Sequence, residues 1–241
     1  MSGIKKEHDM KSIRIITAAA ALLAAASLQS CLKDDGPSYS DLVPNAVVTV
    51  KPDGDKFYLQ LDDETVLYPT NIDKSPFGDK EVRAFINYKV ETEKKGEQTG
   101  YINWFKELLT KQTVASEGSD EKNDEKFGND PIEIVNAFPT VCEDGYLTLR
   151  FETWWGYSGN TKHEVNLLTG IDPDDPYTVE FRHNAHGDLA EVLSDGYVAF
   201  RLSDLPDTKG QTVTLKVRFN SPRGIRTAEF KYKTRPGDEE K

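Results

Sequence analysis

The residues with the clearest capacity for chemistry lie in the segment 183–188. His183, His186 and Asp188 follow the pattern H-x-x-H-x-D, and imidazole nitrogens together with a carboxylate are a common ligand set for zinc. In a strand, side chains three positions apart point to opposite faces, so the two rings converge only where a turn intervenes. Residues 184–188 have the composition of such a turn. We therefore expect a hairpin whose imidazoles bond to the backbone, and we expect no metal and no cofactor.

Three other segments resemble reactive sites only in part. A calcium loop starting at Asp172 would need Gly at its sixth position and Glu at its twelfth, where this chain has Tyr177 and His183. Residues 156–160 approach the G-x-S-x-G pattern of hydrolases but end in Asn, and no helix follows. Cys142 has no identifiable base near it in the sequence, so we interpret it as a structural thiol.

These departures predict a protein that is not an enzyme. A glycosidase with two converging carboxylates stays open as an alternative, because the chain is rich in Asp and Glu.

Trp154 and Trp155 are adjacent in a segment with strand alternation. If Trp155 faces the core, Trp154 faces outward, and Tyr157 lies nearby after Gly156. An exposed Trp–Tyr pair can stack on sugar rings or anchor a partner protein. We therefore take Trp154 and Tyr157 as a candidate ligand platform. The alternative is that both tryptophans lie in the core or under a loop.

Cys31 follows an N-terminal segment with the features of a secretory signal. The apolar run 15–28 is shorter than the roughly 20 residues of a membrane span, and four basic residues precede it. The sequence Leu28-Gln29-Ser30-Cys31 resembles the lipobox of bacterial lipoproteins, although Gln29 is bulkier than usual. That resemblance implies that residues 1–30 are removed and that Cys31 carries fatty acyl chains such as palmitate. Cleavage of an ordinary signal after Ala26 is the alternative.

The residues that follow Cys31 bear on location. Lys33, Asp34 and Asp35 resemble the surface-export signal of Bacteroides-type lipoproteins. We therefore expect residues 31–41 to be a lipidated tether and the protein to face the cell exterior from the outer membrane. A solvated tether on the periplasmic side of that membrane is the alternative.

The chain is acidic. Residues 1–30 carry four basic and two acidic side chains, so their removal changes the formal net charge from −11 to −13. A protein of this charge gains nothing from the counterion release that drives binding to nucleic acids. We expect no nucleic acid partner, and a membrane contact made only through the lipid anchor.

The hydrophobic pattern predicts an all-β protein of two domains. Residues 42–114 contain five short strands, which favour a small OB-like barrel; within them, 101–114 also has helical spacing. Residues 131–235 contain about seven alternating strands, typical of an immunoglobulin-like antiparallel β-sandwich. Residues 115–130 are highly charged and without apolar periodicity, so we expect an acidic linker. We expect residues 236–241 to be a disordered tail.

The lipobox, the barrel pattern, the segment Gly128-Asn129-Asp130-Pro131-Ile132 and the stretch Arg182-His183-Asn184-Ala185-His186-Gly187-Asp188 together resemble the NigD-like lipoproteins. The resemblance covers the mature chain and implies an N-terminal OB-like domain followed by a C-terminal β-sandwich. It implies no established activity; the family takes its name from an association with a bacteriocin locus.

The most economical interpretation is a lipoprotein that acts as a non-catalytic binding module for an envelope protein or a glycan. A carbohydrate-binding accessory protein or hydrolase is one alternative. A self-protection protein associated with a bacteriocin locus is another, suggested only by the family resemblance.

Overall fold

The computed structural model describes residues 38–157, 161–189 and 191–238. The predicted signal peptide, Cys31 and the predicted export signal Lys33, Asp34 and Asp35 lie outside the described residues. The short helix α2 (Tyr39–Leu42) belongs to a separate unit from the rest of the chain. No helix among the described residues has the length and apolarity that crossing a bilayer requires.

The N-terminal domain is a closed five-stranded barrel in the order β1-β2-β3-β5-β4. Its strands are β1 (Ala46–Asp53), β2 (Lys56–Gln60), β3 (Val66–Pro69), β4 (Val82–Lys94) and β5 (Glu97–Glu107). The pair β3–β5 is parallel and the other pairs are antiparallel. Alternate residues such as Val48, Leu59 and Ile86 point inward and are fully buried. The predicted OB-like barrel is confirmed, and the segment with helical spacing is a strand through Glu107.

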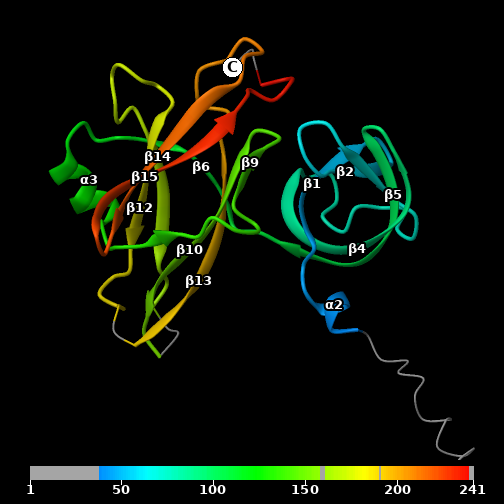
Figure 1. Cartoon of the computed structure of the whole chain (residues 1–241), viewed down its shortest axis with the longest axis horizontal. Coiled ribbons are helices and arrows are strands. Elements are labelled where there is room, and N and C mark those ends of the chain that lie inside the picture. Colours follow the sequence, from blue (N-terminus) through cyan, green and yellow to red (C-terminus); the bar gives the residue numbers. More distant parts are fainter. Residues whose placement is uncertain (1–37, 158–160, 190, 239–241) are drawn as a thin grey trace, which may run out of the picture. The chain divides into compact units, whose positions relative to one another are not determined.

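The C-terminal domain is a β-sandwich of two sheets (Figure 1). One sheet has the order β6-β13-β10-β8, with β9 also paired to β10, and the other has the order β15-β14-β12-β11-β7. The strands of the first sheet are β6 (Thr110–Gln112), β8 (Glu133–Ile134), β9 (Val141–Glu143), β10 (Tyr146–Trp155) and β13 (Val192–Arg201). Those of the second are β7 (Val114–Ala115), β11 (Glu164–Thr169), β12 (Thr178–Asn184), β14 (Val213–Ser221) and β15 (Gly224–Tyr232).

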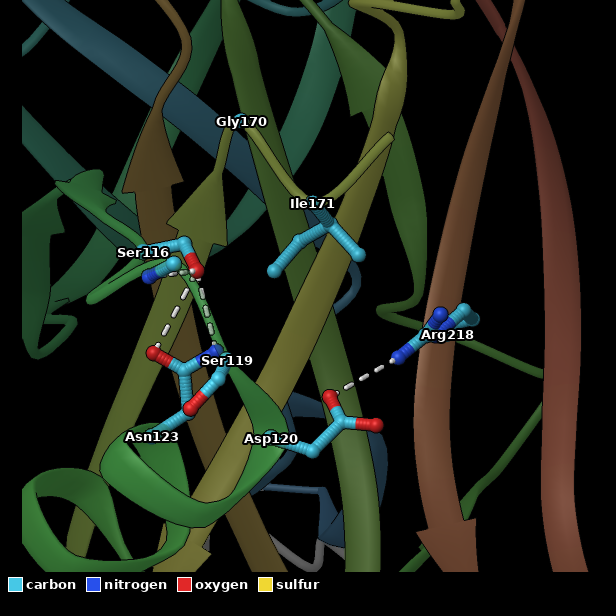
Figure 2. A pocket seen from close by; sticks show the side chains of 8 residues that line it. Ser116, Ser119, Asp120, Asn123, Gly170, Ile171 and Arg218 are labelled. Carbon is cyan, nitrogen blue, oxygen red and sulfur yellow. Dashed lines mark hydrogen bonds and ion pairs between the residues drawn. The ribbon is translucent and has the colours of Figure 1, made fainter. Parts of the chain in front are cut away.

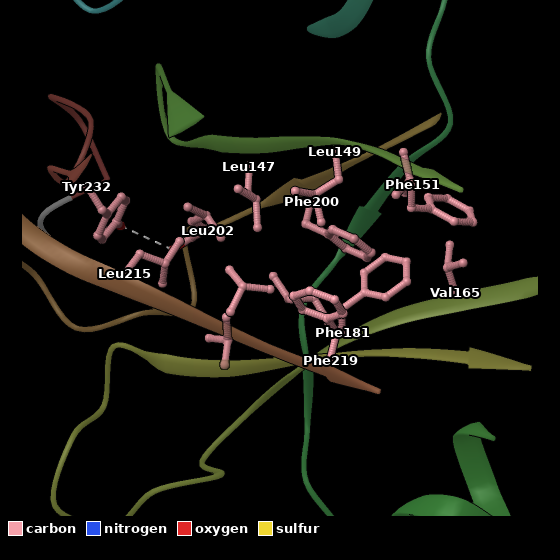
Figure 3. Packing of buried hydrophobic residues seen from close by; sticks show 14 of the residues in the cluster. Leu147, Leu149, Phe151, Val165, Phe181, Phe200, Leu202, Leu215, Phe219 and Tyr232 are labelled. Atoms are coloured by element: carbon pink, nitrogen blue, oxygen red, sulfur yellow. Dashed lines mark hydrogen bonds between the residues drawn. The ribbon is translucent and has the colours of Figure 1, made fainter. Parts of the chain in front are cut away.

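Side chains from the inner faces of both sheets form the core of the sandwich, and Figure 3 shows them pointing toward one another. Phe151 of β10 packs on Phe181 of β12 with ring centroids 5.2 Å apart, and Phe181 meets Phe200 of β13 edge-on at 6.0 Å. This interdigitation is what the period-2 pattern of β10, β12 and β13 predicts.

The sandwich contains three parallel pairs, β12–β14, β11–β7 and β13–β6, whereas a purely antiparallel one was expected. The chain leaves β12, crosses to the other sheet as β13 and returns as β14, so β12 and β14 run in the same direction. The short strands β6 and β7 come directly from the barrel and add to one sheet each.

The prediction of an acidic linker over residues 115–130 is wrong. Val114–Ala115 is a strand of the sandwich, and Asp120–Phe127 is the helix α3, which begins at the N-cap Ser119 and ends at Gly128 (φ 74°). The helix lies against β11 and β12, with Asn123 and Phe127 buried (Figure 1). The prediction failed because Asp120 and Asp124 pair with Arg182 of the sheet and because Asn123 and Phe127 are buried against it, although most of the other charged side chains of the segment are exposed.

The boundary between the two domains therefore differs from the expected one. Thr110–Gln112 pairs with β13, so the sandwich begins near residue 110 and the barrel ends with β5. The predicted tail is also ordered in part. Asp238 donates its backbone N–H to the Arg235 carbonyl at 3.0 Å, and its carboxylate lies 3.2 Å from the Arg235 Nε. Residues 239–241 lie outside the described residues.

A fully buried arginine connects a barrel strand with the sandwich. Arg83 of β4 donates hydrogen bonds to Thr49 of β1 (3.1 Å), to Thr148 of β10 (3.2 Å) and to the Glu143 carboxylate of β9 (2.5 Å). Thr148 lies on the same side of β10 as the polar residues Arg150 and Glu152, the side that would ordinarily face water. Here that end of the strand is buried, because Arg83 covers it.

A second polar cluster surrounds Tyr146, also on β10. The Glu81 carboxylate accepts hydrogen bonds from the Tyr146 hydroxyl (2.5 Å) and from Arg235 (2.8 Å), and it also pairs with Arg201. The guanidinium groups of Arg83, Arg201 and Arg235 lie 5.2–5.8 Å from the centre of the Tyr146 ring. The buried Tyr146 is therefore held by hydrogen bonds and cation–π contacts, and not by packing against apolar side chains.

Candidate functional site

The outer side of β10 and β13 carries exposed apolar side chains. Trp154 is 44% exposed, and its cross-strand partner Leu193 is 49% exposed. Two pairs further along the same face lies Tyr197, which is 40% exposed and opposite Arg150. Cross-strand partners in an antiparallel pair share one face of the sheet. We call the outward side chains Arg150, Glu152, Trp154, Leu193, Asp195 and Tyr197 the β10–β13 face.

Charged side chains lie between the apolar ones on this face. Glu152 is opposite Asp195 of β13 on one side and opposite Glu133 of β8 on the other. Arg150 holds Asp195 with two hydrogen bonds of 2.8 Å, and Arg226 holds Glu133 at 2.6 Å. Within the described part of the chain, the Glu152 carboxylate forms no hydrogen bond or ion pair, although Arg150 attracts it electrostatically. Three acidic residues thus occupy directly opposed positions on three neighbouring strands, and the central one, Glu152, has no ion pair of its own.

The other half of the predicted platform, Tyr157, lies just beyond the end of β10 and is 79% exposed. Trp155 points the other way: it packs against the sandwich core, stacks on the His163 ring at 4.0 Å, and donates its Nε1–H to the Ser194 carbonyl at 3.0 Å. Trp154 and Tyr157 are therefore both accessible to a ligand. Leu193, Glu152 and Tyr197 were not singled out from the sequence, since their cross-strand neighbours depend on the register of β10 and β13.

The segment 184–188 forms a turn. The Asn184 side chain accepts a hydrogen bond from the His186 backbone (2.9 Å), and the Asp188 backbone N–H donates to the Ala185 carbonyl (2.9 Å). His186 has a φ of 50°, a left-handed conformation that is uncommon for a residue with a side chain. Its imidazole is half-exposed and 3.8 Å from Glu164. His183 and His186 therefore do not converge on a common point.

His183 itself lies in β12 and is buried, with the Asp130 backbone beside its ring and a second histidine on the other side. Its Nε2 is 2.9 Å from the Nδ1 of His163, a residue that the sequence interpretation left out. The His163 Nε2 in turn lies 3.5 Å from the Asp188 carboxylate. Gly156 makes room for this carboxylate, because a Cβ at that position would lie 1.9 Å from Asp188 Oδ1. The contact between the two rings was not anticipated, because the register of β11 and β12 brings together two histidines 20 residues apart.

Burial of this pair gives the stability a pH dependence. Burial, with His163 as a second cause, lowers the pKa of His183 to about 4 from 6.5. Between these values the unfolded chain binds a proton that the folded chain does not, so the free energy of unfolding falls as the pH drops from about 6.5 to about 4. We expect a loss of about 3 kcal/mol from this group, measured by urea unfolding at a series of pH values.

Substitution His183→Gln should flatten the slope over this range. His186→Gln is the matched control, since the half-exposed His186 is only the smallest of the causes that act on His183 and its loss should change the slope little. An identical pH dependence for the wild type and His183→Gln would show that other groups cause the loss.

The remaining motifs have internal roles. Asp172 and Asp175 accept hydrogen bonds from backbone N–H groups of their own turn, and the Asp175 carboxylate also pairs with Lys216 at 3.0 Å. Burial raises the pKa of the Cys142 thiol strongly, and its side chain packs against the sandwich core, so a thiolate nucleophile is disfavoured at neutral pH. No cluster of three or more His, Cys, Asp or Glu side chains suited to a metal ion occurs in the described ranges.

A hollow beside α3 was not anticipated from the sequence. A cavity of about 270 Å³ lies next to the start of the helix, and a second of about 410 Å³ lies between the helix and β14–β15. Asp120 and Arg218 line both. Figure 2 shows the Asp120 carboxylate directed at the Arg218 guanidinium, 3.6 Å away, with the Ser116 hydroxyl directed at Asn123.

The charges at this hollow serve mainly to hold the helix. Arg182 of β12 is buried, pairs with Glu180 at 2.6 Å and with Asp120 at 3.6 Å, and also bonds to Asp124 of α3. Arg218 pairs with Glu180 at 2.6 Å. Because these carboxylates and guanidinium groups neutralise one another, we interpret the cluster as the attachment of α3 to the sheet.

Comparisons with known proteins agree with this architecture. The model of the NigD-like N-terminal OB domain matches residues 47–108, and that of the NigD-like C-terminal beta sandwich domain matches residues 114–232. No curated protein matches the chain.

Solved structures share the fold. A protein from Parabacteroides distasonis, described as a candidate toxin-related protein, is 39% identical, with a TM-score of 0.63 over 78% of this chain and 92% of that chain. A NigD-like immunity protein from Bacteroides caccae is 20% identical, with a TM-score of 0.55 over 78% and 95%. A candidate lipoprotein from Bacteroides fragilis is 14% identical, with a TM-score of 0.52 over 78% and 97%. The last two likenesses show the fold alone, whereas the two matched domains and the 39% identity show that this chain belongs to the NigD-like family.

Proposed function

We propose that this protein is a lipid-anchored, non-catalytic binding protein of the outer membrane, directed toward the cell exterior. The lipobox-like sequence before Cys31 supports the anchor, and Lys33, Asp34 and Asp35 support surface export. The description of the Bacteroides fragilis neighbour as a candidate lipoprotein agrees with this proposal.

The β10–β13 face is the observation that carries the binding role. Trp154 and Leu193 lie side by side on a regular sheet and are both nearly half exposed. Tryptophan is among the residues that contribute most to protein interfaces, because it combines a large apolar area with little conformational freedom. Since this face is held by two paired strands, a partner binds to it without ordering a loop. We propose that an envelope protein is the partner.

Two other roles use the same surface. In a carbohydrate-binding accessory protein, Trp154 and Tyr157 would stack on sugar rings. In a self-protection protein, the face would bind a toxic protein at the cell surface; the Bacteroides caccae neighbour is described as an immunity protein and that of Parabacteroides distasonis as a candidate toxin-related protein. These alternatives differ in the chemistry of the ligand and share the requirement for an exposed Trp154.

Cys31→Ala is expected to abolish metabolic labelling with palmitate and to release the protein from the membrane fraction. Each buried CH₂ group contributes about 0.8 kcal/mol, so the acyl chains of a lipoprotein form a lasting anchor. Cys142→Ala is the matched control, because it removes the other cysteine and should leave both labelling and retention unchanged. Membrane retention of Cys31→Ala equal to that of the wild type would contradict lipid anchoring.

Trp154→Ala is expected to weaken partner binding at least about tenfold, with little change in melting temperature, since Trp154 is exposed. Binding would be measured by co-purification from detergent-solubilised outer membranes, followed by titration with the protein recovered. Ile225→Ala removes an exposed apolar side chain from β15 and serves as the control. If both variants retain the partner, the β10–β13 face is not the binding surface. If Trp154→Ala unfolds the protein, Trp154 has a structural role instead.

A further inference from the structure

We infer that the partner of the β10–β13 face presents a lysine or arginine side chain flanked by apolar ones, and that this cation binds at Glu152 beside the Trp154 ring. The inference rests on the proposed binding role of this face and adds the chemistry of the partner.

The row of carboxylates provides the first argument. Glu152 has a carboxylate directly opposite it on each neighbouring strand, Glu133 on β8 and Asp195 on β13. Like charges in directly opposed positions destabilise a sheet. Arg226 and Arg150 form ion pairs with the two outer carboxylates, while Glu152 forms no ion pair with any described residue and receives only the longer-range attraction of Arg150. A cation supplied from outside would remove this unfavourable arrangement.

The neighbouring side chains provide the second argument. Trp154 follows Glu152 by two residues on the same strand, so both point to the same side. A cation that pairs with Glu152 can therefore also lie over the indole ring, where the attraction to the aromatic face adds to the ion pair. Leu193 and Tyr197, which lie two residues before and two residues after Asp195 along β13, offer apolar contacts for the side chains that flank the cation.

The charge of the whole chain points the same way. Without residues 1–30 the formal net charge is −13, so the mature protein attracts basic partners and repels acidic ones before contact. A neutral glycan could stack on Trp154, but it would give the Glu152 carboxylate no ion pair. A basic partner protein satisfies both the apolar and the acidic parts of the face.

The test uses the mature protein and a short synthetic peptide that contains lysine, leucine and tyrosine, with a matched peptide that carries glutamate in place of lysine. Affinities are measured by isothermal titration calorimetry for the wild type and three variants. We expect the lysine peptide to bind and the glutamate peptide not to bind. Trp154→Ala should weaken binding at least about tenfold and Glu152→Gln about fivefold.

Glu91→Gln is the matched control, because it removes the same charge from an exposed position of β4. It should leave the affinity within about twofold of the wild type, since only long-range attraction changes. Equal weakening by Glu152→Gln and Glu91→Gln would mean that the peptide responds to net charge alone, and that result would overturn the inference.

A second measurement on the free protein separates binding from folding. Glu152→Gln removes the repulsion within the carboxylate row, so its melting temperature should rise by about 2 °C while its affinity for the peptide falls. A fall in both would assign Glu152 a structural role and contradict the inference. If Trp154→Ala loses the envelope partner and yet the lysine peptide does not bind, the binding role stands and the basic nature of the partner is wrong.

Discussion

Arg83→Ala is expected to lower the free energy of unfolding by roughly 3–5 kcal/mol. The substitution removes a fully buried guanidinium and leaves the Glu143 carboxylate and the hydroxyls of Thr49 and Thr148 without their donors. Burial already raises the pKa of Glu143, with Arg83 acting to lower it, so loss of Arg83 should raise this pKa further. The stability change would be measured by urea unfolding at neutral pH.

Lys94→Ala is the control for this prediction. Lys94 and Glu97 form an exposed ion pair at 3.9 Å, and its removal should cost less than about 1 kcal/mol. Arg83→Met tests the cause, because it retains much of the side-chain volume but not the donors. If Arg83→Met is as stable as the wild type, the volume of the side chain matters and the hydrogen bonds do not.

Phe181→Ala is expected to cost roughly 3–5 kcal/mol. The ring lies at the centre of the sandwich, between Phe151 and Phe200, and almost none of it is exposed. Its neighbours belong to two sheets whose strands are fixed by hydrogen bonds, so they can only partly close the cavity. Thermal and urea unfolding followed by circular dichroism would measure the loss.

Ile225→Ala, on the exposed side of β15, should change the stability by less than about 0.5 kcal/mol. A small loss for Phe181→Ala would indicate that the two sheets collapse onto the vacated space. The sandwich core would then be less tightly held than the contacts of Phe181 imply.

Alternation was sufficient to predict both domains, because each strand of the barrel and the sandwich buries one face. Leu59 and Ile86 in the barrel, and Leu147 and Phe181 in the sandwich, all lie in the cores where the period-2 pattern placed them. The same pattern places Trp154 outside and Trp155 against the core. These are local properties of one strand, so they can be inferred from one segment of sequence.

Polar positions were harder to predict because their surroundings are set by distant segments. Arg182 and Glu180 have the pattern of solvent-facing residues, yet both are buried beneath α3. The helix α3 in turn forms from a segment with the composition of a linker, because Asp120 and Asp124 pair with Arg182 of the sheet and so stabilise it. In the sequence, nothing about the acidic residues of α3 indicates that they pair with Arg182, and nothing about Arg182 indicates the helix. Arg83 was missed for the same reason.

In the candidate site, too, some features follow from a single strand and others from distant segments. The outward direction of Trp154 follows from its own strand, but its neighbours Leu193 and Asp195 come from the register of β13. The row formed by Glu133, Glu152 and Asp195 requires three strands to be aligned. The sequence therefore identified one residue of the face, and the structure supplied the rest.

The most direct test of the central claim, that the β10–β13 face binds an envelope partner, is site-specific photo-crosslinking in living cells. A benzoylphenylalanine residue would replace Trp154 in one strain and Ile225 of β15 in another, with membrane attachment of both proteins verified. We predict a discrete crosslinked protein adduct from position 154 that position 225 does not form. Absence of an adduct at position 154, or the same adducts from both positions, would contradict the claim.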